Sequence, residues 1–236
     1  MDQDRAPLTD YASLASRLEL PLLRMELTED DVHDGCNRAA DFSIGAVVVR
    51  PSDVDTAVRA LRGTDVAVTS VVSFPHGNAT TPTKLYEARD LIRRGVKEIN
   101  AVINTSKLVS RQFAYLETEL TQLTAACRPE GVVLKVLLVL PPLNLEYKIV
   151  GCRLAKRAEA DYLAFAPATV DDVKFFYERT KWRIKLKAGG NVATLDQALE
   201  MYTEGAERIE TVAVAEILTA WRKRLAEQQA ATVTAT

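Results

Sequence analysis

The sequence predicts a single α/β domain, covering residues 1–236, that folds as a (β/α)8 barrel. Short runs rich in Val and Ile alternate with amphipathic helical stretches, and eight such pairs follow one another. The length of 236 residues and the hydrophobic content of 47% suit one barrel core. An open doubly wound sheet is the alternative. It commonly has a glycine-rich turn after its first strand, whereas "LLRMELTEDD" contains no glycine.

The elements are expected in the following order. A short helix over about 9–17 comes first, the barrel spans about 18–226, and the small polar end at 227–236 is expected to be a flexible tail. Strands are expected at 20–24, 44–50, 66–74, 98–104, 132–140, 162–166, 183–189 and 208–213. Helix caps are expected at Thr28, Ser52 and Thr194, each three residues before an Asp or a Gln. The unbroken strand–helix order predicts parallel pairing with every helix outside.

Charge and composition narrow the classes of partner. The formal charge is −2 and the pI is near 5.8, so nucleic acid and anionic membranes are not expected partners and a small ligand is favoured. No run approaches 18 apolar residues and no signal-like start is present, so neither a membrane span nor secretion is expected. Three unpaired cysteines favour reduced thiols and a cytoplasmic location. With only His33 and His76 available, neither a metal nor a cofactor is expected.

Side chains two residues apart on a strand point to the same face, which allows the polar residues to be sorted. Alternation directs Lys185, Lys187 and Gly189 into the barrel, away from Ile184, Leu186 and Ala188. It also directs inward Glu98, Asn100 and Asn104 of one strand, Lys135 of the next, and Glu210 of the last. Charged groups of both signs are therefore expected to meet inside the barrel.

Two interpretations of these inward charges remain open. They can be mutually compensated ion pairs, since an unpaired buried ammonium is costly. Alternatively, a lysine beside another cation has a lowered pKa, and its neutral amine can attack a carbonyl to form a Schiff base, the chemistry of metal-free aldolases.

Five segments in order carry a resemblance to a known family. They are "SVVSFPHGNATTPTKLYEA" (70–88), "GVKEINAVINTSKL" (95–108), "VVLKVLLVL" (132–140), "KAGGNVATLDQAL" (187–199) and "EGAERIETVAVAEIL" (204–218). Together they resemble the signature segments of the 2-deoxyribose-5-phosphate aldolase family, from about residue 18 to 218. The resemblance implies a barrel whose sixth-strand lysine forms the Schiff base. It also implies a seventh-strand lysine that tunes this amine, a fourth-strand aspartate that helps to move protons, and a phosphate cradle at strands seven and eight.

The chain keeps some of these positions. Lys187 matches the seventh-strand lysine, and Gly189 and Gly190 keep part of the phosphate-binding turn. Glu98, on the fourth strand, is also retained, and Lys135 is a further candidate amine.

The chain departs from the family pattern at the positions that carry the chemistry. The segment "DYLAFAPAT" has Ala164 where the Schiff-base lysine belongs, and Asn100 matches the fourth-strand aspartate. Glu210 stands in the phosphate cradle where a glycine is usual, Val139 replaces an often acidic residue, and Arg50 stands where an asparagine is common. Glu98, Glu210, Arg50 and the two glycines are therefore candidate ligand-binding residues.

Three functions remain open at this point. The chain can be a non-catalytic homologue, or pseudoenzyme, that binds a carbonyl or sugar metabolite or a protein partner. It can be a diverged lyase that uses Lys187, or else Lys185 or Lys135, on another carbonyl substrate. It can also retain cleavage of deoxyribose 5-phosphate to glyceraldehyde 3-phosphate and acetaldehyde. A homodimer is possible, with an outer aromatic patch supplied by Phe175, Phe176, Tyr177 and Trp221.

Overall fold

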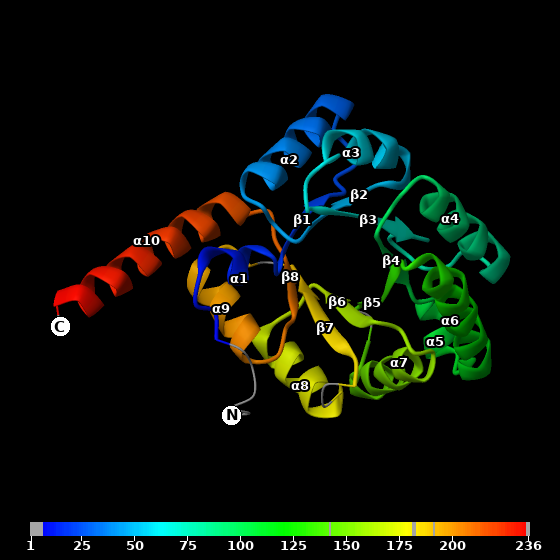
Figure 1. Cartoon of the computed structure of the whole chain (residues 1–236). Helices are drawn as coiled ribbons and strands as arrows, with labels where there is room; N and C mark the ends of the chain where they lie inside the picture. Colours follow the sequence, from blue (N-terminus) through cyan, green and yellow to red (C-terminus); the bar gives the residue numbers. More distant parts are fainter. Residues whose placement is uncertain (1–6, 142, 181–182, 191, 235–236) are drawn as a thin grey trace.

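The computed structural model describes residues 7–141, 143–180, 183–190 and 192–234. Within them, eight strands pair in sequence order, β1 with β2 through to β8 with β1, to close a barrel in which every pair is parallel. Helices surround the ring of strands on the outside (Figure 1). The (β/α)8 architecture expected from the sequence is confirmed.

The strand bounds are close to those expected. The strands are β1 (Leu18–Leu22), β2 (Ala46–Val49), β3 (Ala67–Val72), β4 (Glu98–Val102), β5 (Val133–Val139), β6 (Tyr162–Ala166), β7 (Lys185–Gly189) and β8 (Arg208–Glu210). The first strand starts and ends two residues before the expected position, and Pro21 lies inside it without interrupting the pairing. Glu19 O accepts a bond from Thr211 N on the β8 side, so by alternation Pro21 also faces that side. The β8 pairing has ended there, at Glu19 with Glu210, and no ladder bond is lost.

The helices are α1 (Tyr11–Ala15), α2 (Glu29–Asp41), α3 (Val54–Ala60), α4 (Thr81–Arg93), α5 (Thr105–Val109), α6 (Phe113–Cys127), α7 (Leu145–Arg157), α8 (Val170–Thr180), α9 (Leu195–Thr203) and α10 (Val214–Thr234), with 3-10 turns η1 (Pro51–Asp53) and η2 (Arg128–Glu130). The last helix extends away from the barrel (Figure 1). Most of the segment 227–236, expected to be a flexible tail, is therefore helical up to Thr234, as its Ala, Glu and Gln content allows.

Two of the three expected helix caps are confirmed. Thr28 with Asp31 begins α2, and Thr194 with Gln197 begins α9, each as a reciprocal capping box. The expectation for Ser52 is wrong, because the residues from Pro51 form a 3-10 turn before α3 begins.

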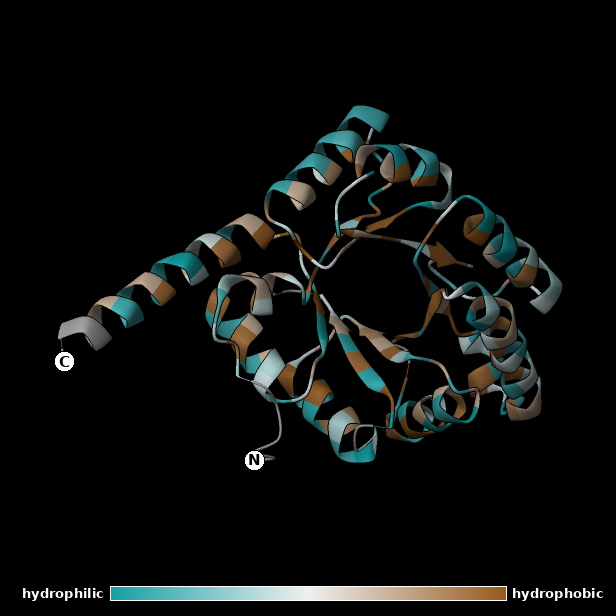
Figure 2. Ribbon diagram, in the orientation of Figure 1, coloured by the Kyte–Doolittle hydropathy of each residue, from teal (hydrophilic) through white to brown (hydrophobic). Residues whose placement is uncertain are grey.

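The main core lies between the outer faces of the strands and the helices. On β4, for example, Ile99 and Ala101 belong to this layer. Brown, apolar segments cover most of the barrel strands, and the helices alternate brown and teal (Figure 2). A separate small apolar cluster, formed by Val102, Leu137 and Ala164, lies on inward positions of β4, β5 and β6. The barrel interior is therefore divided between charged side chains and one apolar wall.

Of the four aromatic residues expected to supply an outer dimer patch, Phe175 and Tyr177 are partly buried and the other two are buried. Phe176 is buried against Phe165, and Trp221 is buried with its Nε1 donating to Asp10 O. Both are core residues, because the inner faces of α8 and α10 pack on the barrel. No described helix has the length and apolar character needed to cross a membrane. The three cysteines, Cys36, Cys127 and Cys152, are free and buried.

A buried ion pair joins two outer helices to the end of a strand. Lys84 of α4 donates to Glu119 of α6 at 2.7 Å and to the carbonyl of Val102 on β4 at 2.9 Å. Burial lowers the pKa of Lys84, although Glu119 opposes this shift. Thr81 donates to the second Glu119 oxygen at 3.0 Å, so both carboxylate oxygens are satisfied. The pair fixes the backbone at Val102, whose side chain forms part of the inner apolar wall.

We predict that Lys84→Met destabilises the protein by about 3–5 kcal/mol, because Glu119 is then left charged, buried and without its partner. The matched control is Arg157→Met, which breaks the more exposed pair between Arg157 of α7 and Glu117 of α6 and is expected to cost less than about 1 kcal/mol. Urea unfolding of both variants measures the difference. If both variants lost the same free energy of unfolding, the Lys84–Glu119 pair would not be the stabilising buried pair that we describe.

Candidate active site

A single buried carboxylate connects the two lysines inside the barrel. Glu19 of β1 is fully buried, and its Oε2 lies 2.7 Å from Lys187 Nζ, while its Oε1 accepts a short bond from Lys135 Nζ. Each lysine has a second acid partner. Lys187 Nζ lies 2.7 Å from Glu210 Oε2, and Lys135 contacts Glu98. The two candidate amines are thus held in one continuous chain of ion pairs.

This chain of ion pairs fixes the charge of its central members. Burial alone would lower the pKa of Lys187, but Glu19 and Glu210 reverse that effect and hold it above its usual value. Burial alone would raise the pKa of Glu19, but Lys135, Lys187 and Arg208 hold it well below its usual range. Lys187 is therefore an ammonium ion at neutral pH, and Glu19 is a carboxylate.

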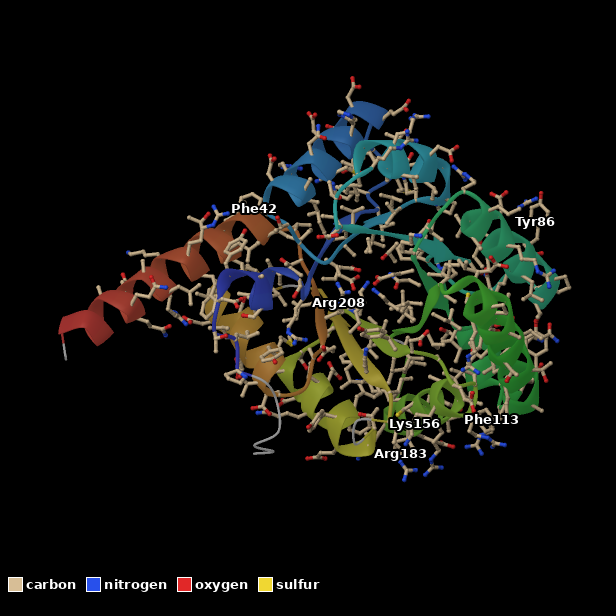
Figure 3. All side chains as sticks on the ribbon, in the orientation of Figure 1. Phe42, Tyr86, Phe113, Lys156, Arg183 and Arg208 are labelled. Atoms are coloured by element: carbon tan, nitrogen blue, oxygen red, sulfur yellow. The ribbon has the colours of Figure 1, made fainter. Side chains whose placement is uncertain are left out.

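Further polar groups extend the cluster toward the amino ends of the strands. Arg208 Nη2 lies 3.4 Å from Glu98 Oε1, and Thr69 donates to Glu98 Oε2 at 2.8 Å. Arg208 lies within the ring of strands (Figure 3). Its pKa is raised because Glu98 and Glu19 outweigh the effect of burial. Burial raises the pKa of Tyr162, which lies beside Arg208. Three acids, Glu19, Glu98 and Glu210, balance three bases, Lys135, Lys187 and Arg208.

The position next to Lys187 carries no functional group. Ala164 of β6 is the Cα partner of Lys187 on β7 and is fully buried. It lies in the apolar cluster with Val102 and Leu137, against which Val139 and Ala166 also pack. An amine at this position would lie between an ammonium ion and an apolar wall, but the methyl group of alanine cannot form an imine.

Within the described part of the chain, Asn100 has a buried polar atom with neither a hydrogen bond nor an ion pair, whereas Lys187 Nζ, which also lacks a hydrogen bond, lies at ion-pair distance from Glu19 and Glu210. Asn100 is 2% exposed and lies on an inward position of β4, beside Lys135 in the register of β4 and β5. Among the described residues, its Oδ1 has no hydrogen-bond partner. A buried acceptor without a partner is costly, so this atom favours a ligand that donates a hydrogen bond.

The carboxyl ends of β7 and β8 form a closely packed edge. A Cβ placed on Gly189 would lie 3.4 Å from Glu210 Oε1, in van der Waals contact, so the carboxylate packs against this glycine. Gly190 has a φ of 137°, a conformation that favours glycine. The Thr211 hydroxyl donates to Val192 O and accepts from Ala213 N at 3.0 Å. The chain's own groups therefore occupy this edge.

The remaining candidates lie away from the cluster. Arg50 binds Asp53 and donates to the carbonyls of Arg24, Met25 and Leu27, at distances of 2.9 to 3.2 Å for the three carbonyls. It thus holds the loop after β1. The expectation of a buried Lys185 is wrong, because this residue lies at the open amino end of β7. It is exposed there, with its Nζ 5.5 Å from the ring centroid of Tyr162. Asn104 lies beyond β4 and caps α5 by accepting from Lys107 N.

Sequence reasoning missed Glu19, the central residue of the cluster, and Arg208. The pattern "LEL" at 18–20 places one acid between two leucines, which is the alternation of an inward charge on a strand. The first strand was expected to begin at residue 20, so this signal was left outside it. Arg208 stands two residues before Glu210 and shares its face.

Comparison of the sequence with those of known proteins identifies the family. The chain is 34% identical over 218 residues to a deoxyribose-phosphate aldolase from Thermoanaerobacter sp. (strain X514), covering 89% of this chain and 98% of that protein. It is 33% identical over 206 residues to one from Aciduliprofundum boonei, covering 85% and 93%. The chain belongs to the deoxyribose-phosphate aldolase family. A scan against models of protein families found no match.

Solved structures agree with this membership. An aldolase called QR15 superposes with a TM-score of 0.84 at 28% identity, over 89% of this chain and 96% of that one. A tetrameric deoxyribose-phosphate aldolase from Aeropyrum pernix has a TM-score of 0.82 at 23% identity, over 91% and 93%, which shows a shared fold. The deoxyribose-phosphate aldolase barrel is thus kept over most of the chain, while Ala164, Asn100 and Glu210 stand at its inward positions.

We predict that the ion-pair cluster stabilises the protein at neutral pH and loses this effect at low pH. Glu19 has a lowered pKa in the folded state, so its contribution is complete above the unfolded value of about 4.3 and disappears as the pH falls below it. Lys187 has a raised pKa, so its contribution is complete below about 10.4 and is lost only at higher pH.

The measurement compares the free energy of unfolding of the wild type with that of Glu19→Gln between pH 3 and 9. We expect a gap of about 3–5 kcal/mol at pH 7, because two lysines lose their shared partner. The gap should be constant from about pH 5 to 9 and narrow toward pH 3. If the difference in free energy of unfolding between the two proteins widened as the pH fell, the predicted direction of the pH dependence would be wrong.

Proposed function

We propose that this member of the deoxyribose-phosphate aldolase family is a non-catalytic barrel that binds a small molecule without forming a Schiff base. The observation that carries the proposal is the state of its inner amines. Position 164 has no amine, and Lys187 is buried between two carboxylates that raise its pKa. Schiff-base formation requires an unprotonated amine that a carbonyl carbon can reach.

The alternative amines are no better placed. Lys135 is fully buried between Glu19 and Glu98, so attack on a carbonyl would first require the loss of two ion pairs. Lys185 is exposed at the opposite end of the strand from the carboxyl edge, where (β/α)8 barrels hold their active sites. A diverged lyase that uses one of these lysines is therefore less well supported than binding.

The barrel interior nevertheless retains features of a binding site. The Asn100 acceptor is buried and unpartnered, and the wall formed by Val102, Leu137 and Ala164 is apolar. Binding sites for small molecules commonly combine an apolar lining with a few placed polar groups. We therefore assign the family's barrel interior here to noncovalent binding.

We predict that borohydride reduction in the presence of acetaldehyde or other small aldehydes leaves no adduct on any inner lysine of the wild-type protein. Ala164→Lys is expected to acquire one, because Lys187 and the apolar wall both lower the pKa of the new amine. Ala164→Met, similar in size but without an amine, is the matched control and should acquire none. Intact mass measurement and peptide mapping give the site.

Each contrary result selects another function. A wild-type adduct mapped to Lys187 or Lys135 would replace the proposal by a diverged lyase. Turnover of deoxyribose 5-phosphate by the wild type would show that the family's activity is retained. A shift in the melting temperature with a small ligand, without an adduct, supports binding, because a ligand that binds only the folded state stabilises it.

A further inference from the structure

We infer that the barrel interior accepts small uncharged molecules that carry hydroxyl groups and rejects phosphate esters, and that Glu210 is the residue that decides this. The inference rests on the proposed function, since it describes the ligand of the same site. It is carried by three features: a carboxylate already bound to Lys187, an edge at which three backbone donors bond within the chain, and the buried Asn100 Oδ1, which has neither a hydrogen bond nor an ion pair with the described residues.

Glu210 occupies the place where an external anion would meet Lys187. Its Oε2 lies 2.7 Å from Lys187 Nζ, and its Oε1 lies against Gly189. The Glu210 side chain is 18% exposed and that of Lys187 only 3%, so the carboxylate is the member of the pair nearer to solvent. The ammonium group most available for binding a phosphate is thus neutralised by a group of the protein itself.

Three backbone donors at this edge bond within the chain. Ala168 N donates to Gly189 O at 2.8 Å, Val192 N donates to Gly190 O at 2.7 Å, and Ala213 N donates to the Thr211 hydroxyl at 3.0 Å. Free N–H groups in turns of this kind bind anions, but these three are satisfied internally. A phosphate ester would therefore add negative charge next to Glu210 without gaining hydrogen bonds from them.

The charge inside the barrel is balanced before any ligand enters. Each of the three bases contacts at least one of the three acids. A dianionic ligand would disturb this balance, whereas an uncharged ligand leaves it intact.

The groups that remain available suit a hydroxylated carbon skeleton. Asn100 Oδ1 requires a hydrogen-bond donor, which a hydroxyl group supplies. The wall of Val102, Leu137 and Ala164 suits C–H and CH2 groups, such as those of a deoxy sugar. A small neutral sugar offers both features in one molecule.

Thermal unfolding with two matched probes tests the inference. The wild type is expected to be stabilised by deoxyribose, and to bind deoxyribose 5-phosphate at least about tenfold more weakly, because the two ligands differ only by the charged group. Inorganic phosphate alone should leave the melting temperature unchanged. A wild type that responds to neither probe, or that prefers the ester, overturns the inference.

Variants at Glu210 test its role as the deciding residue. Glu210→Gly removes both the charge and the side chain and should reverse the preference, so that deoxyribose 5-phosphate and inorganic phosphate now raise the melting temperature. Glu210→Gln keeps the shape and should give an intermediate response. Glu98→Gln is the control for the charge balance alone, because it removes the same charge beside Lys135 at the other end of the cluster, and it should shift the preference toward the ester less than Glu210→Gln does. Failure of Glu210→Gly, folded by circular dichroism, to gain a response to phosphate overturns the role of Glu210.

These outcomes are independent of the test of the proposed function. A borohydride-trapped adduct on a wild-type lysine overturns noncovalent binding whichever probe is preferred. A preference for the ester without any adduct overturns only the inference about the ligand.

Discussion

The buried carboxylate of Glu19 is the interaction on which the interior of this barrel depends. It lies on the first strand and binds lysines from the fifth and the seventh, and the register of β1 with β8 places Glu210 beside it. Two lysines cannot be buried together as ammonium ions without such a group, since each would be left unpaired or would lose its proton. The same contact keeps the pKa of Lys187 raised, and this supports our proposal of binding without a Schiff base.

Stability and chemistry therefore oppose each other at this site. A family member that forms a Schiff base needs one amine kept neutral, which follows when a second cation outweighs the nearby acids. Here the residue beside Lys187 on β6 is Ala164, which has no amine, and Glu210 is a second acid in contact with Lys187. The charges inside the barrel are therefore balanced, which supports the proposal of noncovalent binding.

Residues outside the ring of strands also help to position the residues that line the barrel interior. Lys84 and Glu119 lie outside the strands, yet Lys84 donates to the carbonyl of Val102, whose side chain lies in the inner apolar wall. Arg50 similarly holds the loop that follows β1 through three carbonyl groups. These charged residues hold the backbone in place by hydrogen bonds to its carbonyl groups. This structural role can be recognised only from the atoms that they bind.

The sequence by itself determined the fold class, all eight strand positions to within three residues, and the inward direction of Lys135, Lys187 and Glu210. Those features are local, because hydrophobic periodicity and strand alternation require only neighbours in the chain. The tertiary structure decided the partners: that Glu19 joins Lys135 to Lys187, that Lys185 is exposed, and that Asn100 has no partner. Register between strands far apart in the sequence sets these contacts, and the protonation state of Lys187 follows from them rather than from its position alone.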